Sequence, residues 1–204
     1  MSSTPTETGS GPVARSRREE ILEVAVRMFA TRGYHGVSMD DIGRAVDVTG
    51  PALYHHFKGK EAMLVAALRP VSQRLLSGGR KRVEANPDDP RAALHALVEF
   101  HVDFALTNPA VIALHVHELD RLPDESRHEI RKLQRQYVEE WVTVLVALRP
   151  ELSEKQARVL AHAAFGLMNS TPYFTQRGQG GHTDHLDTAR LLREATLGAL
   201  AGTP

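Results

Sequence analysis

Apolar residues recur at helical spacing along nearly every long segment, and no segment shows the sustained apolar–polar alternation of a half-buried strand. The pattern therefore predicts an all-α protein. A first helix over about residues 15–31 places its apolar side chains on one stripe: Ile21, Leu22, Ala25, Met28 and Phe29. Gly33 stands where a left-handed C-terminal cap is expected, and Arg17 falls outside the stripe, in solvent.

Two short helices are predicted next. Ser38 and Asp41 form a capping box that opens a helix running to about Val46. Thr49 and Pro51 then mark the start of a second helix, which ends at about residue 57. The spacing predicts a small core against Met28 and Phe29, formed by Ile42, Ala45, Val48, Leu53 and Phe57. It leaves these residues facing outward: Gly50, Ala52, Tyr54, His55 and His56.

Longer helical patterns fill the rest of the chain. They cover about residues 61–83, 91–107, 109–121, 124–148, 153–174 and 184–201. The breaks fall at residues 86–90 and at Pro109, Pro123 and Pro150, and residues 175–183 are expected to form a loop. The chain thus divides into a tail (1–14), a three-helix unit (15–60) and a larger helical unit (61–204).

The N-terminal tail and the longest apolar run bear on targeting. Residues 1–14 are small and polar and are interrupted by Pro and Gly, unlike a signal peptide. The strongest apolar run, residues 141–148, is far shorter than the roughly 20 residues of a membrane-spanning helix. We expect no membrane association. The absence of cysteine excludes disulfides, cysteine zinc fingers and thiol nucleophiles, and favours a reducing cytoplasm.

Charge limits how the protein could bind a polyanion. The formal net charge is zero, and residues 1–60 hold eight Lys or Arg against seven Asp or Glu. Generic nucleic-acid binders are usually basic. Two short helices joined by a tight turn, with a third packed across them, nevertheless form a helix-turn-helix whose second short helix can enter the DNA major groove. Any DNA contact must then be local and geometric.

Three sequence elements in order carry a family resemblance. They are FATRGY at 29–34, SMDDIG at 38–43 and VTGPALYHHFKGKE at 48–61, and together they resemble the tetracycline-repressor (TetR) family of regulators. The resemblance implies that Tyr54, His55, Lys60 and Ser38 contact DNA phosphates. It also implies that Thr49, Gly50 and Ala52 face base edges in double-stranded operator DNA. Pro51 stands where many members carry a polar residue. Tyr54 could instead cover the core, and Lys60 taken alone could be an ordinary surface lysine.

The resemblance further implies a homodimer built on the last two long helices, 153–174 and 184–201. The candidate interface residues are Leu160, Ala164, Leu167, Leu192 and Leu197, on a stripe with Leu186, Ala189 and Leu200. The alternative is that these side chains form an intramolecular core. Two recognition helices related by a two-fold axis read half-sites about 34 Å apart, so the operator should be a near-palindrome.

A ligand pocket is expected among residues 91–148 and the start of the 153–174 helix, because such pockets are largely apolar with a few placed polar groups. The candidates are His101, Phe104, Trp141, Phe165 and Asn169, each of which could instead be core. The aliphatic interior favours a small hydrophobic ligand. Segments 118–123 and 137–141 resemble actinobacterial-type family members that regulate lipid metabolism, which implies an acyl-CoA or sterol-like ligand.

Other functions are less well supported by the sequence. His115 and His117 lie two residues apart on a helix and point to different faces, and His182 and His185 flank a loop, so no metal or other cofactor is expected. Nucleophile-elbow, phosphate-loop and zinc-protease patterns are missing, which argues against an enzyme. The function expected is that of a ligand-responsive repressor. The alternative is a helical small-molecule-binding or scaffolding protein whose DNA-binding head is non-functional.

Overall fold

The computed structural model describes residues 16–172 and 185–201, and every regular element in these ranges is helical. The N-terminal tail and the loop expected at 175–183 lie outside the described residues, as does His182. The first three helices, which we call the head, are α1 (Arg17–Arg32), α2 (Met39–Ala45) and α3 (Gly50–His56). The remaining helices are α4 (Lys60–Glu84), α5 (Pro90–Thr107), α6 (Pro109–His117), the short 3-10 helix η1 (Leu119–Arg121), α7 (Asp124–Leu148), α8 (Glu154–Met168) and α10 (His185–Ala201).

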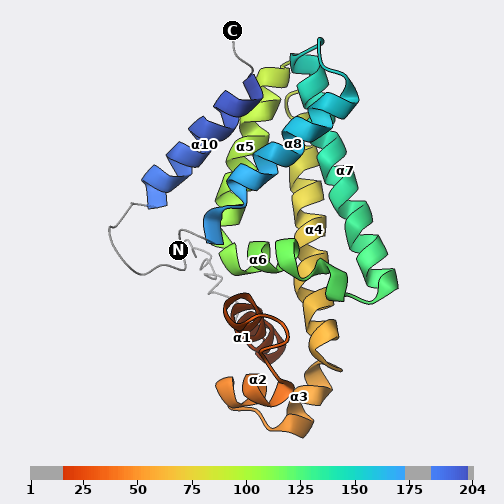
Figure 1. The fold of residues 1–204 in the computed structure, drawn as a ribbon, viewed down its shortest axis with the longest axis vertical. Coiled ribbons are helices and arrows are strands. Elements are labelled where there is room, and N and C mark those ends of the chain that lie inside the picture. Colours follow the sequence, from red (N-terminus) through yellow and green to blue (C-terminus); the bar gives the residue numbers. More distant parts are fainter. Residues whose placement is uncertain (1–15, 173–184, 202–204) are drawn as a thin grey trace, which may run out of the picture.

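The head forms one end of the molecule, and α4 runs from it into the larger helical part (Figure 1). The core of the head is built by the apolar faces that the sequence predicts: Ile21, Ala25, Phe29, Ile42, Leu53 and Phe57 are buried. The first three turns of α4 belong to the same core through Met63, Leu64 and Leu68. Leu114 of α6 and Ile130 of α7 also join it, so the head packs directly on the larger part.

One predicted core position of the head is wrong. Ala45 is exposed, and Val46 is buried in its place. The helical period ends here, because α2 stops at Ala45 and Asp47 adopts a positive φ of 52°. The chain then turns back, and the amide of Val48 donates to the carbonyl of Gly43 at 2.9 Å.

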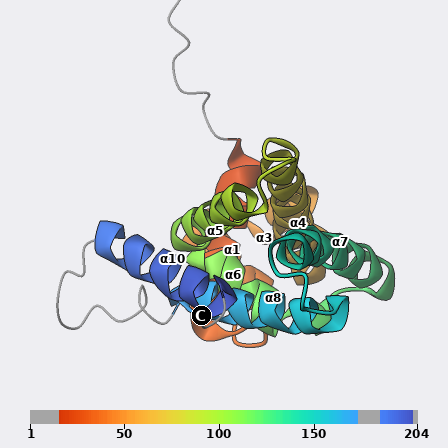
Figure 2. The same ribbon diagram turned by 90° about the horizontal axis from the view of Figure 1, so that it is seen from above.

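The larger part is a layered bundle in which α4 packs on α5 and α7, and α8 crosses α7 and α10. Figures 1 and 2 show α8 and α10 together on one side of this bundle. Its core contains the aliphatic residues of α5 and α7 and the single tryptophan, Trp141, which is fully buried. Gly78 and Gly79 allow two aromatic rings to lie directly against α4, namely Phe100 from α5 and Tyr137 from α7.

Two helix boundaries differ from the sequence prediction. The helix expected at 109–121 is divided into α6 and η1, because Arg121 and Leu122 donate to carbonyls three residues back instead of four. The helix expected at 153–174 ends at Met168, where Asn169 is the C-cap and the Ser170 hydroxyl donates to the Leu167 carbonyl at 2.6 Å.

Within the described residues, no single helix is both long and apolar enough to cross a membrane. Helices α5 and α6 have the required length and composition only together, as a pair bent by 97°.

Candidate DNA-binding head and ligand cavity

Helix α3 is the exposed element of the head. Leu53 and Phe57 anchor it in the core, and this fixes which of its faces is turned outward. Tyr54 is 55% exposed, and His55 and Thr49 are also exposed. Gly50 and Ala52 are half-buried. Thr49 is the N-cap but its side chain makes no capping hydrogen bond, so its hydroxyl and methyl groups remain available on this surface.

The turn between α2 and α3 requires a glycine at position 43, in the last turn of α2. A Cβ on Gly43 would lie 2.8 Å from the carbonyl oxygen of Val48, which is backbone and cannot move aside easily. The close approach allows the Val48 amide to bond back to Gly43 and brings α3 tightly across α2. This geometry is that of a helix-turn-helix.

Ser38 forms the predicted capping box with Asp41. Its hydroxyl donates to the Asp41 carboxylate at 2.6 Å and accepts from the Asp41 amide at 3.1 Å. The Ser38 amide also donates to the carboxylate, at 2.9 Å. The bonds that the carboxylate accepts from the Ser38 hydroxyl, the Ser38 amide and Arg44 lower the pKa of Asp41 to about 2. The exposed Ser38 side chain, expected to contact phosphate, is therefore already hydrogen-bonded to Asp41, and the anion at the start of α2 is the Asp41 carboxylate itself.

Lys60 is also engaged within the head. Its Nζ lies 2.8 Å from the carbonyl oxygens of both Tyr34 and Val37. The ammonium group additionally lies 4.3 Å from the centroid of the Tyr34 ring. Lys60, the first residue of α4, therefore connects this helix to the segment that precedes α2.

Two arginines near the start of α1 were missed as head contacts. Arg17, expected in solvent, donates to the carbonyl of Val46 and pairs with Glu20. The Arg18 guanidinium lies 4.3 Å from the centroid of the Phe57 ring, at the end of α3. Helical periodicity alone gives no sign of these contacts, because both partners are about 30 or more residues away along the chain.

A cavity of about 210 Å³ lies in the larger part of the molecule. Three of the five predicted ligand residues line it, namely His101, Phe165 and Asn169. Trp141 is not among the lining residues; it is buried behind Phe165, with the ring centroids 5.1 Å apart. Phe104 is turned away, into a separate groove between α4 and α5, where the Arg74 guanidinium lies 5.5 Å from its ring centroid.

His101 is the centre of one hydrogen-bonded chain in the cavity. Its Nε2 lies 3.0 Å from Asn169 Oδ1, and its Nδ1 lies 3.1 Å from the Tyr137 hydroxyl. Burial lowers the pKa of His101 to about 4, so the ring is neutral at physiological pH. Because Asn169 Oδ1 can only accept, Nε2 carries the proton and Nδ1 accepts from Tyr137.

His115, which was not predicted to line the pocket, is the centre of a second hydrogen-bonded chain. The Ser72 hydroxyl donates to the Leu68 carbonyl at 2.9 Å, so it accepts from His115 Nε2 at 3.1 Å. Gln134 Nε2 lies 3.0 Å from His115 Nε2 and 3.3 Å from Nδ1. Because Nε2 carries the proton, only Nδ1 can accept from this amide. Burial lowers the pKa of His115 to about 4, so this ring is also neutral.

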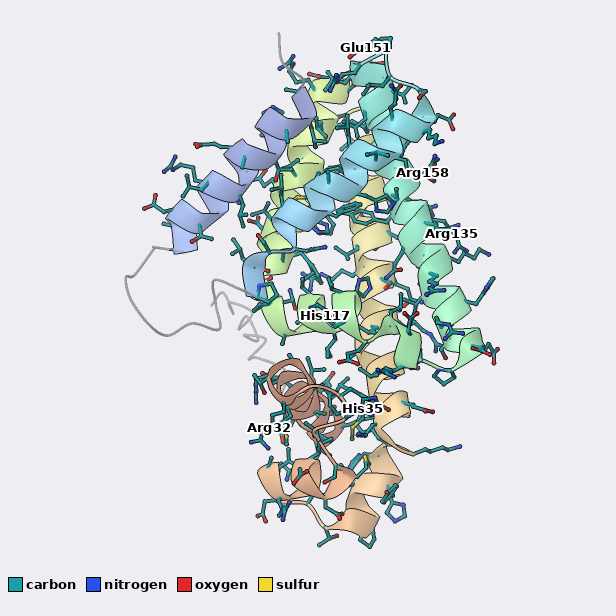
Figure 3. All side chains as sticks on the ribbon, in the orientation of Figure 1. Arg32, His35, His117, Arg135, Glu151 and Arg158 are labelled. Atoms are coloured by element: carbon teal, nitrogen blue, oxygen red, sulfur yellow. The ribbon has the colours of Figure 1, made fainter. Side chains whose placement is uncertain are left out.

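Cavity residues from four helices were thus missed by sequence reasoning. They are Ser72 and Leu75 on α4, Ile112 and His115 on α6, Gln134, Tyr137 and Val138 on α7, and His162 on α8. Outside the cavity, Arg158 of α8 donates to Glu139 of α7 through two nitrogens, at 3.0 and 2.7 Å, and joins the two helices (Figure 3).

The predicted interface residues differ in their burial. Ala164 is buried in the protomer's own core, and Leu160, Leu192 and Leu197 pack partly against that core. Leu167 is exposed. Ala164 therefore belongs to the intramolecular core, as in the alternative interpretation, because its side of α8 faces inward.

Another set of residues, which shares only Leu167 with the predicted interface, forms an exposed apolar surface on α8 and α10. It comprises Val159, Ala163, Gly166 and Leu167 on α8, with Leu191, Ala195 and Gly198 on α10. We call this set the α8–α10 face.

Most of the histidines are spread over several helices of the described part of the chain. His117, at the end of α6, is exposed (Figure 3). Within residues 16–172 and 185–201, no group of three or more His, Asp or Glu side chains is arranged to hold a metal ion.

The fold and the head define the class of protein: a helical transcriptional regulator with an N-terminal helix-turn-helix. Residues 21–67 match the family described as "Bacterial regulatory proteins, tetR family", and residues 87–193 match "Tetracyclin repressor-like, C-terminal domain". The chain belongs to the TetR family of regulators, which are DNA-binding proteins and not enzymes.

Individual relatives agree with this assignment. The chain is 31% identical over 148 residues to the transcriptional repressor KstR2 of Rhodococcus jostii, covering 72% of this chain and 71% of that protein. It is 26% identical over 166 residues to the regulator EthR of Mycolicibacterium smegmatis, covering 81% and 74%. Among solved structures, KstR2 of Mycobacterium tuberculosis superposes with a TM-score of 0.78 at 23% identity, covering 93% and 95% of the two chains.

Proposed function

We propose that the protein is a ligand-responsive repressor that binds a near-palindromic operator as a homodimer and is released by a small, largely apolar molecule. One observation carries the proposal: a single helix, α4, belongs to both sites. Met63 and Leu64 of α4 pack in the core of the head, and Ser72 and Leu75 of α4 line the cavity. A ligand that displaces α4 from the cavity side would therefore also shift the head. The coupling free energy between two such sites is typically about 1 to 3 kcal/mol.

For DNA binding, we propose that Thr49, Gly50 and Ala52 face base edges and that Tyr54 and His55 contact phosphates. The exposure of these residues on α3 supports the assignment. Thr49 offers a hydrogen bond or a methyl group, whereas Gly50 and Ala52 offer only close approach and apolar contact. Much of the specificity must then come from two-fold spacing and DNA shape.

The DNA-binding test is selection from a pool of genomic fragments at physiological salt, followed by affinity measurements on the selected fragment. We expect Tyr54→Ala to weaken binding markedly, whereas Val116→Ala, an exposed apolar residue on α6 outside the head, should not. Selection of no fragment by the wild type, together with a positive response to ligand, would favour the alternative of a ligand-binding protein with a non-functional head.

Dimerisation is proposed through the α8–α10 face. Val159 on α8 is 63% and Leu191 on the neighbouring α10 is 51% exposed, and exposed apolar patches often mark an interaction site. A Cβ added at Gly166 or Gly198 would have no neighbour within 4 Å, so another helix could approach either backbone closely. A four-helix bundle with the same two helices of a second copy would cover this face.

The dimer is tested by light scattering on two charge-introducing variants. Ala163→Glu places a carboxylate in the α8–α10 face and should give a monomer. Ala85→Glu, at the exposed end of α4, adds the same charge elsewhere and should leave the dimer intact. Dimers in both variants would place the interface on another surface.

We propose that the part of the ligand that enters the cavity is small and hydrophobic. Many ligand sites occupy about 300–1,000 Å³, and a cavity of about 210 Å³ suits a short acyl group better than a complete sterol or coenzyme A. Two structural relatives support an acyl-CoA or sterol-like class: AibR, solved with isovaleryl coenzyme A and operator DNA, and the M. tuberculosis ketosteroid regulator KstR2. We favour the acyl-CoA class on size.

Trp141 provides the assay for the ligand. It is the only tryptophan, and its ring packs against Phe165 and Tyr137, which line the cavity. Isovaleryl-CoA should change its fluorescence and release the operator, whereas coenzyme A without an acyl group should do neither. Absence of any response across acyl-CoA and steroid panels would refute this ligand class.

The proposal of repression is tested separately from that of binding. KstR2 of R. jostii is a repressor, whereas FasR of M. smegmatis, which is 38% identical over 88 residues, is an activator. Deletion of the gene should raise transcription from the promoter next to the selected operator. A fall in transcription would instead identify an activator.

A further inference from the structure

The ammonium group of the half-buried Lys60 lies beside two backbone carbonyls. Both carbonyls, those of Tyr34 and Val37, lie 2.8 Å from Nζ, and the Tyr34 ring lies beside the same group. An ammonium has three N–H donors. Two are used by the carbonyls, and the ring provides a favourable surface for the positive charge.

The two segments joined by Lys60 flank the helix-turn-helix. Val37 is buried and immediately precedes Ser38, the N-cap of α2. Lys60 begins α4, three residues after Phe57, the C-cap of α3. The side chain therefore connects the point where the chain enters α2 with the point where it has left α3.

Other observations indicate that this junction has a defined geometry. A Cβ on Gly36 would lie 2.4 Å from the carbonyl oxygen of Arg32, so the chain before α2 can bend tightly only with glycine there. Gly59, just before Lys60, has a φ of 156°. The connection before α2 and the start of α4 thus both have restricted backbone conformations, and Lys60 provides a polar contact between them.

We propose that Lys60 is a positioning residue for DNA binding and not a phosphate contact. Its ammonium holds the Tyr34–Val37 segment against α4 and so sets the angle at which α2 and α3 are presented. Two of the three N–H groups of the ammonium are used by the carbonyls and the Tyr34 ring lies beside the same group, so most of its bonding capacity is spent within the protein. Charge-assisted hydrogen bonds of this kind are stronger than neutral ones. This inference rests on the proposed DNA-binding function, and it differs from the role that the TetR resemblance implies for this lysine.

Salt dependence separates the two roles. Each lysine that neutralises a phosphate contributes about 0.9 to the slope of log affinity against log salt concentration, so a phosphate contact in both protomers would contribute about 1.8. A positioning residue changes affinity without changing the number of neutralised phosphates. The test compares wild type, Lys60→Met and Lys58→Met on the selected operator fragment at several salt concentrations.

We expect Lys60→Met to weaken binding by about tenfold or more at every salt concentration, with the wild-type slope retained. Lys58, exposed and two residues away, is the matched control for loss of one positive charge in the same turn. A Lys60→Met slope that falls by about 1.8 would overturn the proposal. An unchanged affinity with an unchanged slope would overturn it as well.

Amide hydrogen exchange on the free protein completes the test. In Lys60→Met, amides of residues 34–38 should exchange faster than in wild type and in Lys58→Met, with helical content retained by circular dichroism. Unchanged exchange in this segment would overturn the proposal. If the wild type selects no DNA, the proposed function fails, but hydrogen exchange still decides whether Lys60 holds this junction.

Discussion

Gly79 shows how closely the cavity wall is packed on α4. It lies inside this helix, buried against the ring of Tyr137, which lines the cavity. A Cβ at Gly79 would lie 2.5 Å from Cε2 and 3.0 Å from Cδ2 of Tyr137. The ring is held in place, because its hydroxyl bonds to His101 and its plane meets that of Trp141 at 90°. We predict that Gly79→Ala destabilises the protein.

Two opposing effects set the magnitude. Alanine is favoured over glycine inside a helix by about 1 kcal/mol. An extra carbon in a well-packed core costs about 1–3 kcal/mol. The net loss should therefore be about 1 kcal/mol. In a Tyr137→Ala background the obstructing ring is gone, so Gly79→Ala should instead stabilise the protein by about 1 kcal/mol.

The assay is urea unfolding of wild type, both single variants and the double variant, followed by far-UV circular dichroism. All four are compared at one protein concentration, because self-association would add to the apparent stability. The sign reversal corresponds to a coupling free energy of about 1–3 kcal/mol. Equal stabilisation by Gly79→Ala in both backgrounds would refute the reasoning that Tyr137 limits the space at this position.

Three further predictions concern pH, the core of the head and its capping box. Burial lowers the pKa of His101 and His115, so on acidification the unfolded protein binds protons at these rings before the folded protein does. The free energy of unfolding should therefore fall as the pH is lowered from about 6.5 to about 4, by up to about 3 kcal/mol for each histidine. The fall should be smaller in His115→Gln. Leu53→Ala should cost about 2–5 kcal/mol in urea unfolding and abolish operator binding, because this fully buried side chain anchors α3. Ser38→Ala removes an N-cap and should cost about 1 kcal/mol. The same variant should raise the pKa of Asp41 above its value of about 2, as measured by NMR titration of the carboxyl group.

Features that depend on neighbouring residues could be read from the chain. The capping box at Ser38, the turn before α3 and most helix boundaries follow from local hydrogen bonding and from the 3.6-residue period. The buried face of the head was predicted for the same reason, except at Ala45, where the end of α2 interrupts the period. The family resemblance in 29–61 then supplied the function of the head.

Features that depend on which helices meet could be decided only by the tertiary structure. Ser72, His115 and Gln134 come from three helices, and no spacing in the sequence predicts that their side chains share one cavity. Ala164 looked suited to an interface, but the crossing of α8 turns it into the core.

The head shows the same division most clearly. The sequence by itself determined that residues 38–60 form a helix-turn-helix with an exposed α3, because capping and periodicity are local properties. Only the tertiary structure decided that the ammonium of Lys60 reaches the carbonyls of Tyr34 and Val37, more than 20 residues earlier in the chain. A hydrogen bond between distant segments depends on packing that brings them together, and local sequence patterns contain no information about that distance.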